Sequence, residues 1–200
     1  MIRLSEITQM HRDLVIRWHE QPVDNPHAGL LGVICQQHGF NFSLWHEEDK
    51  ARCREASDSQ IAAVKRAIDK LNQQRNDWIE RIDDWIADEL ASRCVLPPSD
   101  APQNSETLGS TIDRLSILSL RIYHLEEQCA RTDASPEHQH SVCSKLAVAR
   151  AQLDDLSRSA QQLADDLLAG RKRHKTYRQL KMYNDPALNP YLYQTARPAA

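Results

Sequence analysis

Glycine is scarce in this chain of 200 residues, which contains only five, at positions 29, 32, 39, 109 and 170. A chain of this length with average composition would carry about 14. The spacing of the five fits neither G-x-G-x-x-G nor G-x-x-x-x-G-K, so the sequence excludes a Rossmann dinucleotide-binding loop and a P-loop. An all-β fold, which uses glycine in its turns, is also disfavoured. The abundance of Leu, Ala, Gln, Arg, Asp and Glu favours helices instead.

Apolar periodicity and helix-end signals predict five helices in a single domain over residues 1–200. Ser57 and Ser135 are expected to cap the third and fifth helices, and Gly170 to end the fifth. The expected bounds of the five helices are 5–20, 30–55, 58–93, 110–131 and 136–169.

The remaining segments are expected to connect these helices or to follow them. Residues 94–109 contain three prolines and are expected to form a connection without secondary structure. After Gly170 the chain is expected to continue briefly as a helix to about residue 183. Two X-Pro pairs then predict an extended tail over 184–200.

The faces of the helices predict how they pack. In the helices over 58–93 and 136–169, apolar residues recur at helical spacing along one side. In the helix over 110–131 they lie on nearly all sides, which is typical of a helix at the centre of a bundle. The sequence therefore predicts an all-α fold: an antiparallel bundle of about five helices with a long third helix and a buried fourth.

Charge, thiols and hydropathy narrow the class of protein. Lys and Arg number 25 against 28 Asp and Glu, so no duplex nucleic acid is expected as a partner. The five cysteines form no C-x-x-C pair and indicate reduced thiols, mostly in core positions, of a cytoplasmic protein. No apolar stretch is long enough to span a membrane, and the first residues lack the apolar region of a secretory signal.

Polar residues beside the apolar stripes are the main clue to function. Burying so many unpaired charges would cost on the order of several kcal/mol each, so we expect them to pair, to bind an ion or to line a wet cavity. The cations among them favour an anionic ligand. We predict a pocket between the second, third and fourth helices that binds an anionic small molecule through Asn41, Trp45, Lys65, Asn72, Arg75, Asn76, Arg114 and Arg121.

The same pocket offers candidate catalytic and metal-binding groups. His124 and Asp113 are the expected acid or base groups. Mg²⁺ prefers carboxylate oxygens and substrate phosphates, and its expected ligands here are Glu48, Asp49 and Asp83. Helical nucleotide pyrophosphohydrolases carry paired E-x-x-E and E-x-x-D motifs, of which this chain has only the second. The sequence has neither C-x-x-C nor H-E-x-x-H and thus no signature of a zinc site.

A purely structural interpretation of the same residues stays open. In that interpretation Asp113 or Arg114 pairs with Arg75 or Glu48 in buried salt bridges that fix the register of the helices. His124 is then a hydrogen-bonded core histidine. The polar residues would stabilise the fold or an assembly, without forming a ligand site.

Four runs of sequence resemble a bacterial family catalogued as domain of unknown function 4254. They are LWHEEDKAR (44–52), IAAVKRAIDKLNQQRNDWIERID (61–83), NSETLGSTIDRLSILSLRIYHLEE (104–127) and YRQLKMYNDPALNP (177–190). The resemblance extends over roughly residues 38–190. It implies an all-α cytoplasmic protein, in some cases associated with gene sets for cell-surface glycans, and it implies no activity, cofactor or catalytic residue.

Two functions follow as hypotheses. The first is a hydrolase or transferase that acts on a phosphorylated small molecule, a nucleotide or sugar phosphate, with Mg²⁺ as its expected cofactor. The alternative is a non-enzymatic interaction or assembly protein, accessory to cell-surface glycan synthesis. In the alternative, the chain forms a homo-oligomer or binds a partner through its carboxyl-terminal tail.

Overall fold

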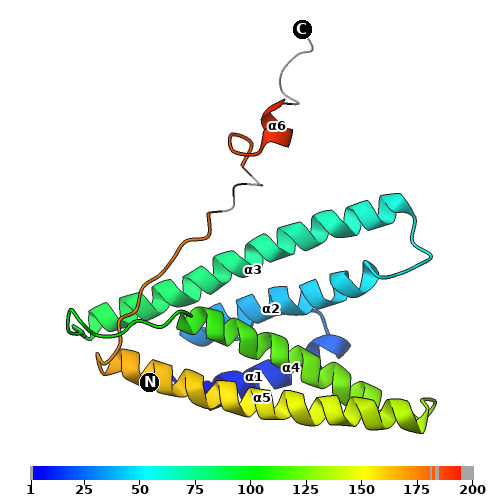
Figure 1. Ribbon diagram of the computed structural model, residues 1–200, viewed down its shortest axis with the longest axis horizontal. Coiled ribbons are helices and arrows are strands. Elements are labelled where there is room, and N and C mark those ends of the chain that lie inside the picture. Colours follow the sequence, from blue (N-terminus) through cyan, green and yellow to red (C-terminus); the bar gives the residue numbers. More distant parts are fainter. Residues whose placement is uncertain (1, 181, 183–184, 195–200) are drawn as a thin grey trace.

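The structure is a computed structural model that describes residues 2–180, 182 and 185–194. Within this part the chain forms α-helices and no strand, which confirms the predicted all-α bundle (Figure 1). The helices are α1 (Leu4–Glu20), α2 (Gly29–Lys50), α3 (Asp58–Ser92), α4 (Leu108–Ala130), α5 (Pro136–Leu168) and α6 (Pro190–Gln194).

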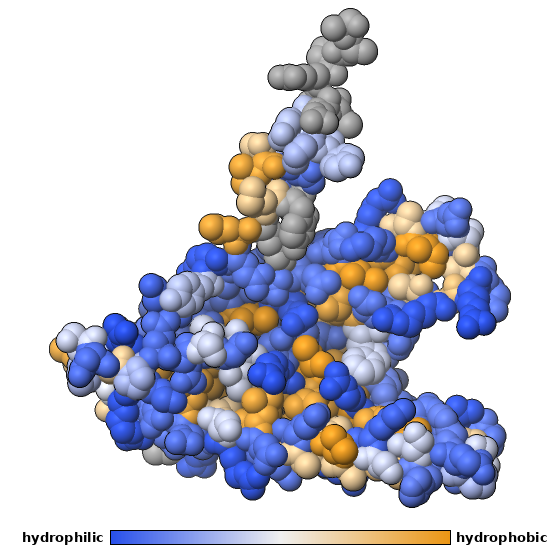
Figure 2. Space-filling model, in the orientation of Figure 1, coloured by the Kyte–Doolittle hydropathy of each residue, from blue (hydrophilic) through white to orange (hydrophobic). Residues whose placement is uncertain are grey.

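The other four long helices are arranged around α4. Helices α2 and α3 form one antiparallel hairpin, and α4 and α5 form a second (Figure 1). Helix α4 contacts α1, α2, α3 and α5, as its apolar surface on nearly all sides predicts. Its Leu108, Ile112 and Leu115 are completely buried. The space-filling view shows a notch between the amino-terminal half of α3 and the end of the α4–α5 hairpin (Figure 2).

Most helix ends follow the predicted signals. Ser57 and Gln60 form a capping box at the start of α3, and the Ser135 side chain caps α5. Gly170 has a φ of +67°, the left-handed conformation that glycine adopts after a helix. Two starts differ from expectation. Helix α1 begins at Leu4 without a side-chain cap, and α4 begins at Leu108 because the Thr107 side chain accepts a hydrogen bond from the Ser110 amide.

The carboxyl-terminal ends of two helices differ more strongly from the predicted bounds. Helix α2 ends at Lys50, not near residue 55, because residues 51–56 form the turns that reverse the chain into α3. The expected continuation of α5 to about residue 183 is wrong over residues 171–180, which contain no helix, and residues 181 and 183 lie outside the described residues. The chain instead crosses to other segments: the Arg173 amide donates to the Pro102 carbonyl, and Arg178 pairs with Glu80 and Asp84.

The tail over 184–200 is described only at residues 185–194. This part is not extended throughout, because it contains a turn and the short helix α6. Pro190 occupies the first position of α6, where proline is favoured, and the Asn189 side chain accepts a hydrogen bond from the Tyr191 amide. The segment leads away from the bundle (Figure 1). Residues 184 and 195–200 of the expected tail lie outside the described residues.

The positions of the cysteines differ from expectation. Of the five thiols only Cys35 is buried, so the expectation that most fill core positions is wrong. Cys53 and Cys94 are exposed in connections and Cys143 is exposed on α5. Cys129, near the end of α4, is half-buried against a small apolar cluster of α4 and α5. No helix in the described part of the chain is both long and apolar enough to cross a membrane.

Candidate functional site

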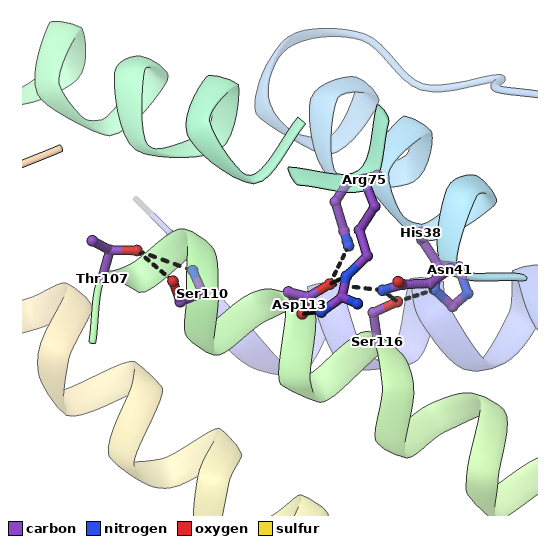
Figure 3. A network of polar contacts seen from close by, with 8 residues as sticks. His38, Asn41, Arg75, Thr107, Ser110, Asp113 and Ser116 are labelled. Atoms are coloured by element: carbon purple, nitrogen blue, oxygen red, sulfur yellow. Dashed lines mark hydrogen bonds and ion pairs between the residues drawn. The ribbon is translucent and has the colours of Figure 1, made fainter. Parts of the chain in front are cut away.

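A buried carboxylate lies where α2, α3 and α4 meet. The Asp113 side chain is only 5% exposed. Its Oδ1 accepts hydrogen bonds from Gln37 Nε2 at 2.6 Å, from Asn41 Nδ2 at 2.9 Å and from Arg75 Nε at 2.9 Å. Its Oδ2 accepts a second bond from Arg75, from Nη2 at 2.6 Å (Figure 3). A bidentate ion pair and two amides therefore stabilise a charge that burial alone would disfavour.

The polar network continues from Asp113 into α1. Asn41 Nδ2 also donates to Ser116 Oγ at 2.8 Å, and Ser116 Oγ lies 2.6 Å from His38 Nδ1 (Figure 3). His38 Nε2 lies 3.1 Å from the His11 carbonyl, which can only accept, so Nε2 carries the proton and Nδ1 accepts from Ser116. Burial lowers the pKa of His38 to about 3, and the ring is neutral at pH 7.

A pocket of about 240 Å³ lies beside this network. Helix α2 supplies most of its wall, with one residue from α3, two from α4 and Arg52 just after α2. Polar groups from Asn41, Arg75 and Glu48 surround a mostly apolar wall. The complete lining is Asn41, Leu44, Trp45, Glu48, Asp49, Arg52, Arg75, Ile117 and Leu120.

Six of the thirteen predicted site residues lie at this pocket or directly beneath it. Asn41, Trp45, Glu48, Asp49 and Arg75 line it. Asp113 lies under it and is held by two of the lining residues, Asn41 and Arg75. A cavity therefore lies between the second, third and fourth helices, and binding of an anionic ligand in it stays a prediction. The pairing of Asp113 with Arg75 also matches the structural interpretation of these two residues.

Two predicted cations lie elsewhere. Arg114 and Arg121 were expected in the interior, and both are exposed. They are seven residues apart on α4 and so lie on one face, which lines a groove beside α5 together with Gln152 and Asp155. A helix can be apolar on most of its surface and still leave one narrow polar strip to solvent.

The amino-terminal half of α3 also differs from expectation. Lys65 is exposed and pairs with Asp69, one turn further along the same helix. Asn72 and Asn76 are half-buried and do not line the pocket. Only Ile68 is buried over the first half of α3, so the core does not cover the polar side chains there. The polar stripe of α3 borders the core only in its carboxyl-terminal half.

Asp83 lies away from Glu48 and Asp49, beside the start of α4, where it has a structural role. It is buried, and its Oδ1 accepts a hydrogen bond from the Gly109 amide at 2.9 Å, at the start of α4. Burial raises the pKa of the Asp83 carboxyl. Glu80, the other carboxylate of the E-x-x-D pair, forms an ion pair with Arg178 in the segment after α5. The structure thus does not bring the three expected Mg²⁺ ligands together.

His124 lies in a cluster of histidines that the sequence analysis did not identify. Its ring stacks on Trp45 with centroids 4.9 Å apart and lies 5.2 Å from the ring of His19 and 5.8 Å from that of His46. His19 and His46 are 5.2 Å apart. One nitrogen of each of the three rings lies within 4.8 Å of the other two. Burial and the two neighbouring imidazoles lower the pKa of His46.

The fold and the pocket define a class: an α-helical bundle with a buried ion-pair network beside a small pocket. The chain also matches a family model described as protein of unknown function (DUF4254), over residues 32–176. It therefore belongs to that family, as the sequence resemblance indicated. The match covers α2 to α5 and ends before the run over 177–190. No curated protein and no solved structure matches the chain.

Proposed function

We propose that the pocket between α2, α3 and α4 binds a small phosphorylated molecule, on which the protein acts as a hydrolase or transferase. One observation carries the proposal: Arg75 lines the pocket while Asp113 fixes its guanidinium from below. Arg75 uses Nε and Nη2 to hold Asp113, which leaves Nη1 as a donor for a ligand. A preorganised arginine donor loses little side-chain entropy when it binds an oxyanion.

The size and the wall of the pocket favour a sugar phosphate over a larger nucleotide. Its volume of about 240 Å³ lies below the roughly 300–1,000 Å³ of pockets for drug-sized ligands. Trp45, Leu44 and Ile117 supply flat and apolar surface, which suits the face of a sugar ring. Asn41 supplies an amide at the polar end.

The charges around the pocket favour a divalent cation in the complex. The cations of Arg52 and Arg75 are outnumbered by the carboxylates of Glu48, Asp49 and buried Asp113. A phosphate dianion would add to this negative charge. Mg²⁺ is typically held by one or two carboxylates together with substrate phosphates, so Glu48 and Asp49 suffice as protein ligands without Asp83.

A thermal-shift screen of hexose phosphates and nucleoside monophosphates, with and without Mg²⁺, tests binding. A ligand at 100 times its Kd stabilises the protein by about 2.7 kcal/mol, or a Tm increase of roughly 5–10 °C for a chain of this size. Phosphate release assayed on the ligands that bind tests the reaction. Arg52→Ala should reduce the shift, since Arg52 lines the pocket and is otherwise bound only to Glu48.

Arg54→Ala is the matched control for this experiment. Arg54 is exposed and lies outside the pocket lining, two residues from Arg52. Its substitution should leave the thermal shift unchanged. The proposal fails if no phosphorylated ligand shifts the Tm, or if Arg52→Ala and Glu48→Gln both keep the full shift.

A second candidate function, interaction or assembly, has its own supporting observation. The segment between α5 and α6 carries large apolar side chains that are exposed, among them Tyr177 (60%), Leu180 (88%) and Met182 (57%). A linear group of exposed apolar residues is typical of a segment that docks on a partner or on a second copy. Light scattering of the full chain tests the homo-oligomer, which Leu180→Glu should dissociate. If both the wild-type chain and Leu180→Glu are monomers, self-assembly through this segment is contradicted.

A further inference from the structure

Three histidines from three helices converge at one end of the bundle. His19 lies in the last turn of α1, His46 near the end of α2 and His124 in the second half of α4. One ring nitrogen of each lies within 4.8 Å of the other two. The residues are half-buried, in contrast to histidines scattered on a surface.

The hydrogen bonds of two of these rings fix which nitrogen is free. His19 Nδ1 lies 2.7 Å from the Val15 carbonyl, which can only accept, so Nδ1 carries the proton. His124 Nδ1 lies 2.8 Å from Glu127 Oε2, a carboxylate oxygen that also accepts. In both rings the lone pair is therefore on Nε2. Both Nε2 atoms are buried, and neither has a hydrogen-bond partner among the described residues.

These two arrangements are those of metal-ligating histidines. Such a residue commonly donates its second ring N–H to a carboxylate or to a backbone carbonyl, which orients the ring and raises its basicity. Here Glu127 and the Val15 carbonyl supply the two acceptors. Without a metal, two buried imidazole nitrogens remain unsatisfied, which is costly in a folded protein.

Aromatic packing holds the rings in place. His124 stacks on Trp45 with an interplanar angle of 11°, and His19 stacks on Tyr123 with centroids 4.1 Å apart. Phe42 packs edge-on against His46 at 4.5 Å. Zn–N bonds of about 2.0–2.1 Å place tetrahedral ligand atoms about 3.3 Å apart. The three nitrogens thus need to approach one another by about 1.5 Å at most to reach this geometry.

The electrostatic surroundings also favour a cation. His19 lies at the carboxyl-terminal end of α1, where the helix dipole is negative. The Glu127 carboxylate lies directly behind His124.

We propose that His19, His46 and His124 bind a first-row divalent transition metal ion, with Zn²⁺ as the species tested. Imidazole nitrogens suit Zn²⁺ and its neighbours, whereas Mg²⁺ prefers oxygen ligands, so this site is distinct from any Mg²⁺ bound by Glu48 and Asp49. Three protein ligands leave the fourth tetrahedral position for water or another ligand, as in catalytic zinc sites. The proposal does not depend on the pocket, although Trp45 contacts both sites.

Equilibrium dialysis of the full chain, stripped of metal with a chelator and then titrated with Zn²⁺, tests the site. We expect one tightly bound Zn²⁺ per chain. Co²⁺ should occupy the same position and show the visible absorption of a tetrahedral complex with nitrogen ligands. Loss of a carboxylate behind a ligating histidine costs about 10–100-fold in affinity, so Glu127→Gln should weaken Zn²⁺ binding by that factor. His46→Ala, which removes a ligand itself, should weaken it by about 100-fold or more.

Two controls separate this site from other zinc-binding groups. His140 is exposed at the start of α5, and His140→Ala should leave the affinity unchanged. The thiols of Cys129 and Cys143 lie 2.8 Å apart, and Cys143→Ser tests whether they hold the metal instead. The proposal is overturned if wild-type protein binds no Zn²⁺, if His46→Ala binds it equally, or if Cys143→Ser abolishes binding. Should His46→Ala fail to fold by circular dichroism, thiolate bands in the Co²⁺ spectrum of the wild type would overturn it independently.

Discussion

The replacement Asp113→Ala offers the sharpest test of the buried network. It removes the acceptor of four hydrogen bonds, two from Arg75 and one each from Gln37 and Asn41. The Arg75 side chain, only 24% exposed, then keeps its charge without a partner. Asn41 retains its bond to Ser116, so its loss is partial.

The expected magnitude follows from the burial of the pair. Removing one partner of a buried ion pair typically costs about 3–5 kcal/mol, because the other charge stays uncompensated. A value of about 4 kcal/mol corresponds to a Tm decrease of roughly 8–16 °C for a chain of this size. Domains of this size have unfolding free energies of about 5–15 kcal/mol, so the variant is expected to stay folded at 25 °C.

Urea unfolding followed by circular dichroism measures this loss directly. Asp155→Ala is the control, because Asp155 is 72% exposed, pairs with Arg158 on the same helix and should contribute less than about 0.5 kcal/mol. The double replacement Asp113→Leu with Arg75→Met should recover part of the stability, since it leaves no unpaired charge but still leaves the buried Gln37 amide without its acceptor. A loss below about 1 kcal/mol for Asp113→Ala would refute the reasoning.

Two further predictions concern pH and helix packing. Burial lowers the pKa of His38 to about 3 and also lowers that of His11, whereas unfolded histidine titrates near 6.5. Below about pH 6.5 the unfolded chain then binds more protons than the folded chain. The unfolding free energy should therefore be constant above pH 6.5 and fall by about 1.4 kcal/mol per pH unit for each of the two histidines as the pH drops towards 4. Urea unfolding at pH 7.5, 6 and 5 measures this dependence, and equal unfolding free energies at the three pH values would contradict it. At Gly109 a Cβ would lie 2.7 Å from Asp83 Oδ1 and 2.8 Å from the Ile79 carbonyl. Gly109→Ala should therefore cost about 1–3 kcal/mol in the same assay, against little change for Ser141→Ala on the exposed side of α5. An unchanged unfolding free energy for Gly109→Ala would show that α3 and α4 separate without cost.

Much of the fold follows from local sequence. Ser57, Ser135 and Gly170 set the ends of α3 and α5 through hydrogen bonds and a left-handed backbone that depend on neighbouring residues alone. The apolar surface of the fourth helix predicts its central position because such a helix has to be covered on several sides. The segment after α5 follows local rules only in part, since contacts of Arg173 and Arg178 with distant segments replace the expected helix.

The pocket was predictable to the extent that helical phase determines which side chains point inward. Asn41, Trp45 and Glu48 share one face of α2, and the structure places them together. Phase does not determine how far a face is covered by its neighbours. Lys65 and Arg114 satisfy the same periodicity, yet both are exposed. Lys65 belongs to a part of α3 that the core does not cover. Arg114 belongs to a polar strip of α4 that faces solvent.

The sequence by itself determined an all-α bundle, the ends of most helices and which three helices surround the cavity. These depend on interactions within a few residues and on the need to bury apolar faces. Only the tertiary structure decided which polar groups meet: Asp113 with Arg75, Asp83 with the start of α4, and His19 with His46 and His124. The three histidines lie on α1, α2 and α4, in no motif with a fixed spacing. Their convergence depends on the packing of three helices, which no local pattern encodes.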